Sequence, residues 1–301
     1  MTSILTNVAA MAALQTLRSI NNNLETTQNH VSSGYRVSKA ADNAAYWSIA
    51  TTMRSDNKAL SAVSDALGLG AAKVDTAYSA MDNAIDVVTE IKAKIVAATE
   101  KGVDRTKIQE EVKQLQSQLL SIAQSASFSG ENWVAGNETK SVVSSFVRDG
   151  NGETSVTTTE YVLNSASNGN VLFGTSNGAI DTSTGIIGST NGTVGSIFSL
   201  DISNMSDGDI TLALNVVEQG LESMTKAASQ LGSISTRIQL QENFVSSLSD
   251  SIDSGVGRLV DANMEEESSK LTALQTQQQL AIQSLSIANS SAQNVLTLFQ
   301  R

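Results

Sequence analysis

Hydrophobic residues recur at every third or fourth position along much of this chain, which is the spacing of one face of an α-helix. The first long stripe predicts a helix of about 50 residues, which at 1.5 Å per residue would be about 75 Å long. It comprises Ile49, Met53, Leu60, Val63, Leu67, Val74, Ala77, Met81, Ala84, Val88, Ile91 and Ile95. Gly102 and Asp104 then predict a helix stop and a new N-cap. Two further stripes follow, one of Ile108, Val112, Leu115, Leu119 and Ile122, and a returning one of Ile210, Leu214, Val217, Leu221, Met224, Leu231, Ile234, Ile238, Val245, Leu248 and Ile252.

The centre of the chain, residues 130–208, does not follow this helical pattern. It holds 12 of the 20 glycines and is rich in Ser, Thr and Asn. Asn-Gly and Asp-Gly pairs favour the positive-φ turns that close β-hairpins. We therefore predict a small region of hairpins at the far end of a helical bundle, with a disordered linker as the alternative. The pairs begin at Asp149, Asn151, Asn168, Asn177, Asn191 and Asp207.

The two ends of the chain carry heptad seams that lack charged flanks. Residues 1–33 contain only Arg18 and Glu25 as charged residues, residues 271–300 contain none, and 16 of the latter 30 are Gln, Ser, Thr or Asn. Because neutral amides pair without the desolvation cost of ions, we expect these helices to be buried in an assembly and disordered in the monomer. A terminal hairpin within one molecule is the alternative. The seam residues are Leu14, Leu17, Asn21, Leu24, Gln28 and Val31 near the N-terminus, and Leu271, Leu274, Gln278, Ala281, Leu285, Ala288, Ala292, Val295 and Phe299 near the C-terminus.

Composition narrows the classes of function. The chain of 301 residues has no Pro, no Cys, a single His and a formal net charge of −11. The lack of Pro suits long helices, because an interior Pro costs about 3 kcal/mol. The lack of Cys excludes disulfides and thiolate metal sites, and one His excludes a two-imidazole zinc motif. The acidic charge argues against nucleic-acid binding. We predict a protein that is not an enzyme, with no cofactor, no metal and no membrane-spanning segment.

Two polar features receive a structural interpretation. His30 has no partner nearby in the sequence and is interpreted as a lone polar residue. The run Glu265–Glu267 is interpreted as a solvated helical face and not as a cation site, since Glu266 lies four residues before Lys270.

The segment Val31–Ala45, with the sequence V-S-S-G-Y-R-V-S-K-A-A-D-N-A-A, resembles the flagellin spoke motif. Asn294–Leu298, N-V-L-T-L, is similar to the flagellin terminus, and the resemblance covers roughly residues 1–130 and 210–301. The residues Tyr46-Trp47 and the ending Phe-Gln-Arg look like flagellins of soil- and plant-associated alphaproteobacteria.

The resemblance implies a fold and a function. The fold would be mainly α, a long antiparallel coiled-coil rod with a charge-poor terminal helix pair and a small β-hairpin-rich central excursion. The function would be that of a subunit of the flagellar filament, a homopolymer with heterologous contacts that could include sister flagellins. Its partners would be an export chaperone and the cap and junction proteins. It would be extracellular, exported through the flagellar type III path without a cleaved signal peptide.

The resemblance also assigns residues and regions. The spoke and subunit contact would involve Gly34, Arg36, Lys39 and Asp42. A patch read by an innate receptor would correspond to Glu90, Ile91, Lys92 and Lys94, where Glu90 reverses the charge of the family pattern and predicts weak recognition. The regions would be an inner-core helix and spoke (1–40), a helical arm (41–129), an outer β-hairpin region (130–208), a returning arm (209–261) and a C-terminal inner-core helix (262–301). The alternatives are a hook–filament junction protein and, in a different class, a secreted coiled-coil adhesin or translocator.

Overall fold

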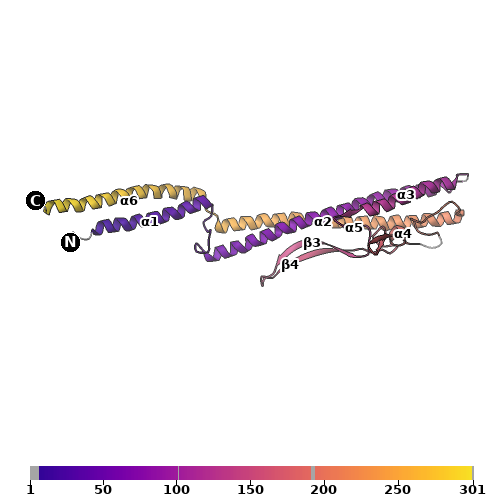
Figure 1. Cartoon of the computed structure of the whole chain (residues 1–301), viewed down its shortest axis with the longest axis horizontal. Coiled ribbons are helices and arrows are strands. Elements are labelled where there is room, and N and C mark those ends of the chain that lie inside the picture. The colour runs from indigo at the N-terminus through magenta and orange to yellow at the C-terminus, as the bar shows by residue number, and fades with distance from the viewer. Residues whose placement is uncertain (1–6, 101, 191–193, 300–301) are drawn as a thin grey trace. The chain divides into compact units, whose positions relative to one another are not determined.

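A computed structural model describes residues 7–100, 102–190 and 194–299, without the side chains of 291–299. It divides into two compact units: unit 1 is formed by the residues up to Asn57 together with those from Asp250 onward, and unit 2 by Lys58–Ser249. A mainly α fold with a small β region in the centre of the chain is confirmed (Figure 1). The helices are α1 (Val8–Ser33), α2 (Ala44–Ala97), α3 (Arg105–Ser125), α4 (Gly185–Gly188), α5 (Asp207–Val260) and α6 (Met264–Phe299), and the strands are β1 (Ser127–Phe128), β2 (Glu131–Asn132), β3 (Thr139–Arg148), β4 (Thr154–Val162), β5 (Gly174–Ser176) and β6 (Ala179–Asp181).

Within unit 2, α2 and α5 pack as antiparallel helices. Ser235 Oγ donates a hydrogen bond to Asp75 at 2.9 Å, and Lys92 forms an ion pair with Glu218. Lys92 lies 17 residues after Asp75 in α2, and its partner Glu218 lies 17 residues before Ser235 in α5. The two helices therefore run in opposite directions. Every stripe residue of α2 from Leu60 to Ile95 is buried, as predicted.

The prediction for the start of the α2 stripe, in unit 1, is wrong at one position. Ile49 is 50% exposed, whereas its neighbour Ala50 is 1% exposed. Ala50 packs in a cluster with Val37, Val256 and Val260. The buried position here is therefore one residue later than the predicted one.

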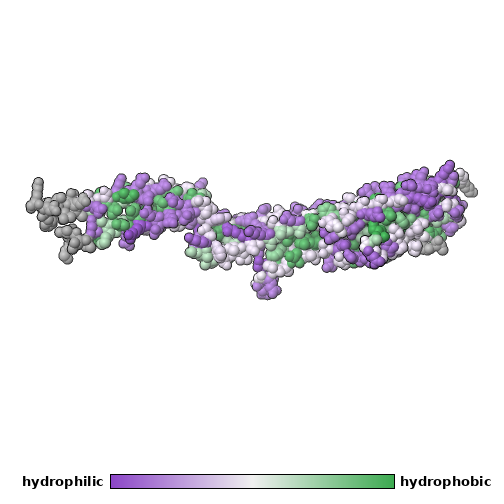
Figure 2. Space-filling model, in the orientation of Figure 1, coloured by the Kyte–Doolittle hydropathy of each residue, from purple (hydrophilic) through white to green (hydrophobic). Residues whose placement is uncertain are grey.

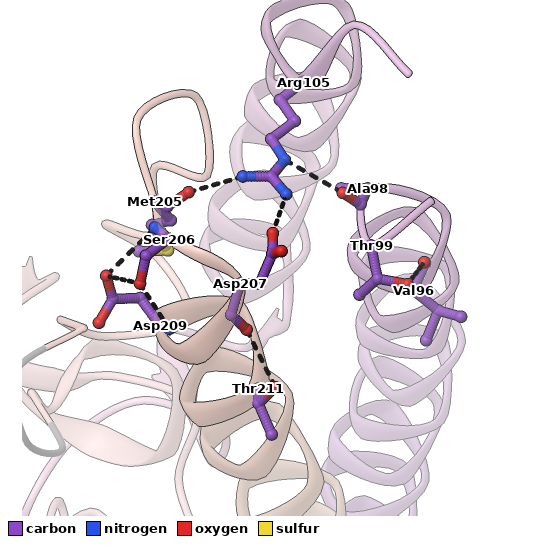
Figure 3. A network of polar contacts seen from close by, with 9 residues as sticks. All are labelled: Val96, Ala98, Thr99, Arg105, Met205, Ser206, Asp207, Asp209 and Thr211. Carbon is purple, nitrogen blue, oxygen red and sulfur yellow. Dashed lines mark hydrogen bonds and ion pairs between the residues drawn. The ribbon is translucent and has the colours of Figure 1, made fainter. Parts of the chain in front are cut away.

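A single arginine joins three segments at one end of the helices of unit 2. Asp104 caps α3 as predicted, and Arg105 is the first residue of that helix. The Arg105 guanidinium donates to the carbonyl of Ala98 at 3.2 Å, to that of Met205 at 2.6 Å and to the carboxylate of Asp207 at 2.5 Å (Figure 3). The end of α2, the start of α3 and the start of α5 are thereby held together.

The buried face of α3 includes two glutamines that the hydrophobic stripe does not predict. Gln109 is 3% exposed and Gln116 is 7% exposed. Gln109 Nε2 donates to the Leu200 carbonyl at 3.0 Å, while its Oε1 accepts from the Ile202 N–H at 2.8 Å. Gln116 Nε2 lies 3.0 Å from the Ile197 carbonyl and 3.1 Å from that of Leu200. The two amides therefore hold the loop before α5 by its backbone.

The hairpin of β3 and β4 lies against the helices of unit 2 and not at the far end of a bundle, which corrects the prediction. Its strands are antiparallel, and the turn between them contains the predicted Asn151-Gly152 pair. A Cβ atom at Gly70 of α2 would lie 2.1 Å from Val142 of β3, so only glycine permits this contact. On the other strand, Arg237 of α5 donates to Thr159.

The remaining Asn-Gly and Asp-Gly pairs have different outcomes. Asn177-Gly178 closes the β5–β6 hairpin with φ angles of 52° and 80°, as predicted. Asp207-Gly208 opens α5 and does not form a hairpin turn. Asn168-Gly169 lies in a turn in which the Gly169 N–H donates to Ala166, but no described strand pair flanks it. Asn191-Gly192 lies outside the described residues.

Candidate assembly interface

In unit 1, α1 and α6 pack side by side in opposite directions (Figure 1). The side chain of Asn7 caps α1 by accepting from the Ala10 N–H at 3.0 Å. Three polar contacts along the pair fix its register: Asn7 Nδ2 to the Ala288 carbonyl at 3.0 Å, Gln278 Nε2 to Asn21 Oδ1 at 2.8 Å, and His30 Nδ1 to Glu267 Oε1 at 3.1 Å. Neutral amides therefore make two of the three contacts.

The predicted seam of α6 lies on its least exposed side as far as the described side chains extend. Leu274 is 7% exposed and Ala281 is 9% exposed. The half-buried positions of the same face are Leu271, Gln278, Leu285 and Ala288. The side chains of Ala292, Val295 and Phe299 lie outside the described ones.

Within the single chain, the predicted seam of α1 faces α6 at only some of its positions. Three seam residues are half-buried, namely Leu17, Leu24 and Val31. The other three are exposed, namely Leu14, Asn21 and Gln28. The positions one residue earlier, Ala13, Ile20 and Thr27, are half-buried or buried instead. Within the chain the contact face of α1 is thus rotated from the predicted one, although Asn21 still reaches Gln278.

The outer faces of the helix pair remain rich in apolar and amide groups. A shallow groove of about 420 Å³ lies between the helices, with Ile20, Leu280 and Ala281 in its lining. On the face seen in Figure 2, hydrophobic residues reach the surface of the pair. The large exposed ones are Val8, Met11, Leu14, Met264, Leu280, Ile282 and Ile287. Among the described residues, no helix has the length and apolar character of a membrane span.

The spoke segment, residues 34–43, connects α1 to α2 and is tied to the junction of α5 and α6. Gly34 ends α1 in the left-handed conformation with φ 75°, which a side chain would disfavour. The Ala262 N–H donates to the Gly34 carbonyl at 2.9 Å, and the Arg36 N–H donates to the Val260 carbonyl at 2.7 Å. Arg36 also donates from its guanidinium to the Leu259 carbonyl at 3.1 Å.

Asp42 organises the second half of the spoke segment. One oxygen, Oδ2, accepts from the N–H groups of Ser38 at 3.0 Å and Lys39 at 3.1 Å, and from the Ser38 hydroxyl at 3.1 Å. The Lys39 N–H, the two Ser38 donors and the Lys39 charge lower the pKa of Asp42 despite a smaller opposing effect of desolvation. The next residue, Asn43, accepts from the Tyr46 N–H at 3.1 Å at the start of α2. Both residues therefore act locally on the backbone.

The Asp42 turn should weaken in acid and on loss of the charge. A carboxylate whose pKa is lowered in the folded state stabilises that state at pH values above its ordinary pKa of about 3.9. This stabilisation is lost as the pH falls through the lowered pKa. We expect Asp42→Asn to speed hydrogen exchange of the Ser38 and Lys39 amides several-fold at neutral pH, with a smaller effect for Ser38→Ala. Unchanged exchange in Asp42→Asn would show that the carboxylate charge does not hold this turn.

Two interpretations of polar residues in this interface are wrong. His30 is not a lone residue, because Glu267 of α6 lies 3.1 Å away. Glu267 does not belong to a solvated face, because it is 9% exposed. The sequence signal that could have found this contact is the antiparallel pairing of the two seams, which brings the start of α6 beside the end of α1.

The candidate receptor patch lies in unit 2 and consists of Glu90, Ile91, Lys92 and Lys94. Ile91 is fully buried, at 0% exposure. Lys94 lies 3.6 Å from Glu90 and 2.7 Å from Glu111 of α3, whose hydrogen bond and charge raise the pKa of Lys94. Lys92 pairs with Glu218 of α5. The charges of this patch therefore hold α2 to its neighbours.

Comparisons with known proteins agree on one family. Residues 4–139 match the family model described as the bacterial flagellin N-terminal helical region, and residues 214–299 match the bacterial flagellin C-terminal helical region. The chain is 55% identical to Flagellin C of Rhizobium meliloti (strain 1021), 50% to Flagellin B of Rhizobium meliloti and 45% to Flagellin of Brucella melitensis biotype 1, and each comparison covers 100% of both chains. Residues 140–213 fall in neither family match, so the family likeness to these models rests on the two helical ends.

Proposed function

The chain belongs to the bacterial flagellin family, and from this premise we propose that its α1/α6 pair is the part of the subunit buried when the filament forms. A flagellin is not an enzyme; it is a structural subunit that polymerises, with sister flagellins, into the extracellular flagellar filament. The family matches favour a filament subunit over the two alternatives, a hook–filament junction protein and a secreted adhesin or translocator. The proposal concerns which surface of the subunit drives assembly.

One observation carries the proposal: beyond Lys270, α6 exposes large hydrophobic residues and carries no charged residue. Leu280 is 59% exposed, Ile282 53% and Ile287 68%. No charged residue occurs in 271–300 to keep this surface in water. Several large exposed hydrophobic residues on a surface without charge mark an interaction site. Each Å² of it removed from water contributes about 25 cal/mol, so polymerisation converts these exposed side chains into filament stability.

The amide groups explain why such a surface suits a polymer of identical subunits. Gln278 and Asn21 already pair across the two helices without any ionic group. Amides carry donors and acceptors on both sides, so they can be satisfied against a neighbouring subunit at a small desolvation cost. Heterologous contacts that repeat without closing produce an open helical filament. Ordering of α1 and α6 on assembly, from a disordered monomer, remains part of this proposal.

The spoke segment and the remaining regions complete the proposal. Gly34, Arg36, Lys39 and Asp42 would hold a subunit contact between inner and outer layers, with the division into regions 1–40, 41–129, 130–208, 209–261 and 262–301. The subunit would reach the filament through the flagellar type III export path. An export chaperone and the cap and junction proteins would be its partners. Backbone ties between the spoke segment and Val260 support a defined geometry for this contact.

A charge added to the exposed side of α6 tests the proposal. Gln279 is exposed, so Gln279→Glu preserves its shape and should leave the monomer unchanged. If that side is buried in the filament, the charge must be desolvated, and we expect the critical concentration for seeded polymerisation to rise tenfold or more. Sedimentation of polymer at a series of subunit concentrations measures this.

The matched control is Gln118→Glu, which adds the same charge to an exposed position of α3. It should change the critical concentration less than about twofold, as is usual for a surface substitution. Equal behaviour of the two variants would contradict burial of the α6 side. Failure of the unaltered protein to polymerise would contradict its role as a filament subunit.

A further inference from the structure

The one histidine of the chain lies in the interface between α1 and α6. His30 Nδ1 is 3.1 Å from Glu267 Oε1, and the side chains are 19% and 12% exposed. Among the described residues, Glu267 is the only charged residue that is buried. The contact joins residues 237 positions apart, so it exists only when the two helices are paired.

The carboxylate of Glu267 is incompletely compensated at this place. Its second oxygen, Oε2, has no hydrogen-bond partner among the described residues, and the same is true of the buried hydroxyl of Thr27. Thr27 lies three residues before His30, on the same face of α1. A buried carboxylate is costly unless it is paired and hydrogen-bonded. The charge state of His30 therefore decides whether this carboxylate has a counter-charge.

Other charged groups near the contact face water. Along α1 and the spoke segment they are Arg18, Glu25, Arg36, Lys39 and Asp42, and along the junction and the first turns of α6 they are Asp261, Glu265, Glu266 and Lys270, all exposed. The Arg36 guanidinium is directed to the Leu259 carbonyl. Exposed charges interact weakly because solvent screens them. Solvent therefore screens the His30–Glu267 contact less than it screens these exposed charges.

We propose that His30 and Glu267 form a pH-sensitive contact that strengthens α1/α6 pairing, and with it filament assembly, as the pH falls from 8 to 6. An imidazole changes its charge between about pH 5 and 8. The imidazolium donates a charge-assisted hydrogen bond to Glu267, whereas the neutral ring leaves a buried negative charge without a counter-charge. The inference rests on the proposed burial of this helix pair in the filament.

The test is the critical concentration for seeded polymerisation of the full chain at pH 6.0 and pH 8.0, at one ionic strength. We expect it to be roughly threefold to tenfold lower at pH 6.0. Carboxylates, lysines and tyrosines ordinarily titrate outside this window, so the single His and the α-amino group are the candidates for the effect. His30→Gln keeps a hydrogen-bond donor without titrating and should abolish the pH difference, whereas an effect of the α-amino group would survive it.

Glu267→Gln provides the second variant, because it removes the buried charge and keeps the shape of the side chain. It should also lose the pH difference, and at pH 8.0 it should polymerise at least as well as the unaltered protein. Equal critical concentrations of the unaltered protein at the two pH values, or a pH difference that persists in both variants, would overturn the inference and leave the proposed function standing. Failure of the unaltered protein to polymerise at either pH would overturn both.

Discussion

Leu274→Asp will prevent this flagellin from assembling. Leu274 is 7% exposed and lies within the seam that α6 presents to α1. The substitution removes a buried aliphatic side chain, worth about 2–5 kcal/mol, and places a charge where burial costs about 3–5 kcal/mol more. Even the lower ends of these two ranges, taken together, raise the critical concentration more than a hundredfold. Sedimentation and electron microscopy of seeded samples would detect no filaments at concentrations at which the unaltered protein polymerises.

Two milder substitutions of Leu274 should have graded effects on assembly. Leu274→Met keeps the volume and should cost less than about 1.5 kcal/mol, while Leu274→Ala should fall between Met and Asp. The helices of unit 2 should be unaffected in all three, because Leu274 belongs to unit 1. Thermal unfolding of the monomer followed by circular dichroism checks this. Filaments formed by Leu274→Asp at an ordinary critical concentration would refute the importance of the seam.

The long helices were the most predictable part of the fold, because a stripe buried against other helices repeats over many turns. From Leu60 to Ile95 each predicted position is buried. The stripe missed the buried position at Ile49, because its neighbour Ala50 is also apolar and is the buried one. Leu14 was preferred to Ala13, although Ala13 is the more buried. A helix with 3.6 residues per turn drifts against a strict heptad, so a long seam shifts from one position to its neighbour.

Buried polar residues could not be found from periodicity. Gln109 and Gln116 look like surface residues, and their role depends on backbone groups of a loop 81 to 93 residues later. His30 and Glu267 posed the same difficulty, because their contact depends on which helices pair. Chain order alone does not specify such partners.

The centre of the chain was predictable in its turns but not in its position. The Asn-Gly pairs at 151 and 177 close hairpins because Gly, and to a lesser degree Asn, tolerate positive φ. The docking of the first hairpin on α2 depends on Gly70, a residue that within a helical stripe looks only like an interruption. The need for glycine at position 70 follows from its contact with Val142. Val142 is far from Gly70 in the sequence, so no local pattern predicts this contact.

Gln109→Leu should lower the free energy of unfolding of unit 2 by about 2–4 kcal/mol. Leucine fills a similar volume but leaves the Ile202 N–H and one donor to the Leu200 carbonyl unreplaced, and both residues are at most 2% exposed. Removing one partner of a buried hydrogen bond costs the desolvation of the group left behind, and here two bonds are lost together. Chemical denaturation of the monomer, followed by helical circular dichroism, measures the difference.

The matched control for this prediction is Gln118→Leu, at an exposed position of the same helix, which should change stability by less than about 0.5 kcal/mol. Gln116→Leu should lie close to Gln109→Leu, because Gln116 bonds the carbonyls of Ile197 and Leu200. The double variant should lose less than the sum of the two, since both glutamines donate to the Leu200 carbonyl and the sites are therefore coupled. A Gln109→Leu protein as stable as Gln118→Leu would mean that the loop before α5 is held by its apolar side chains alone, with no need for the two buried amides.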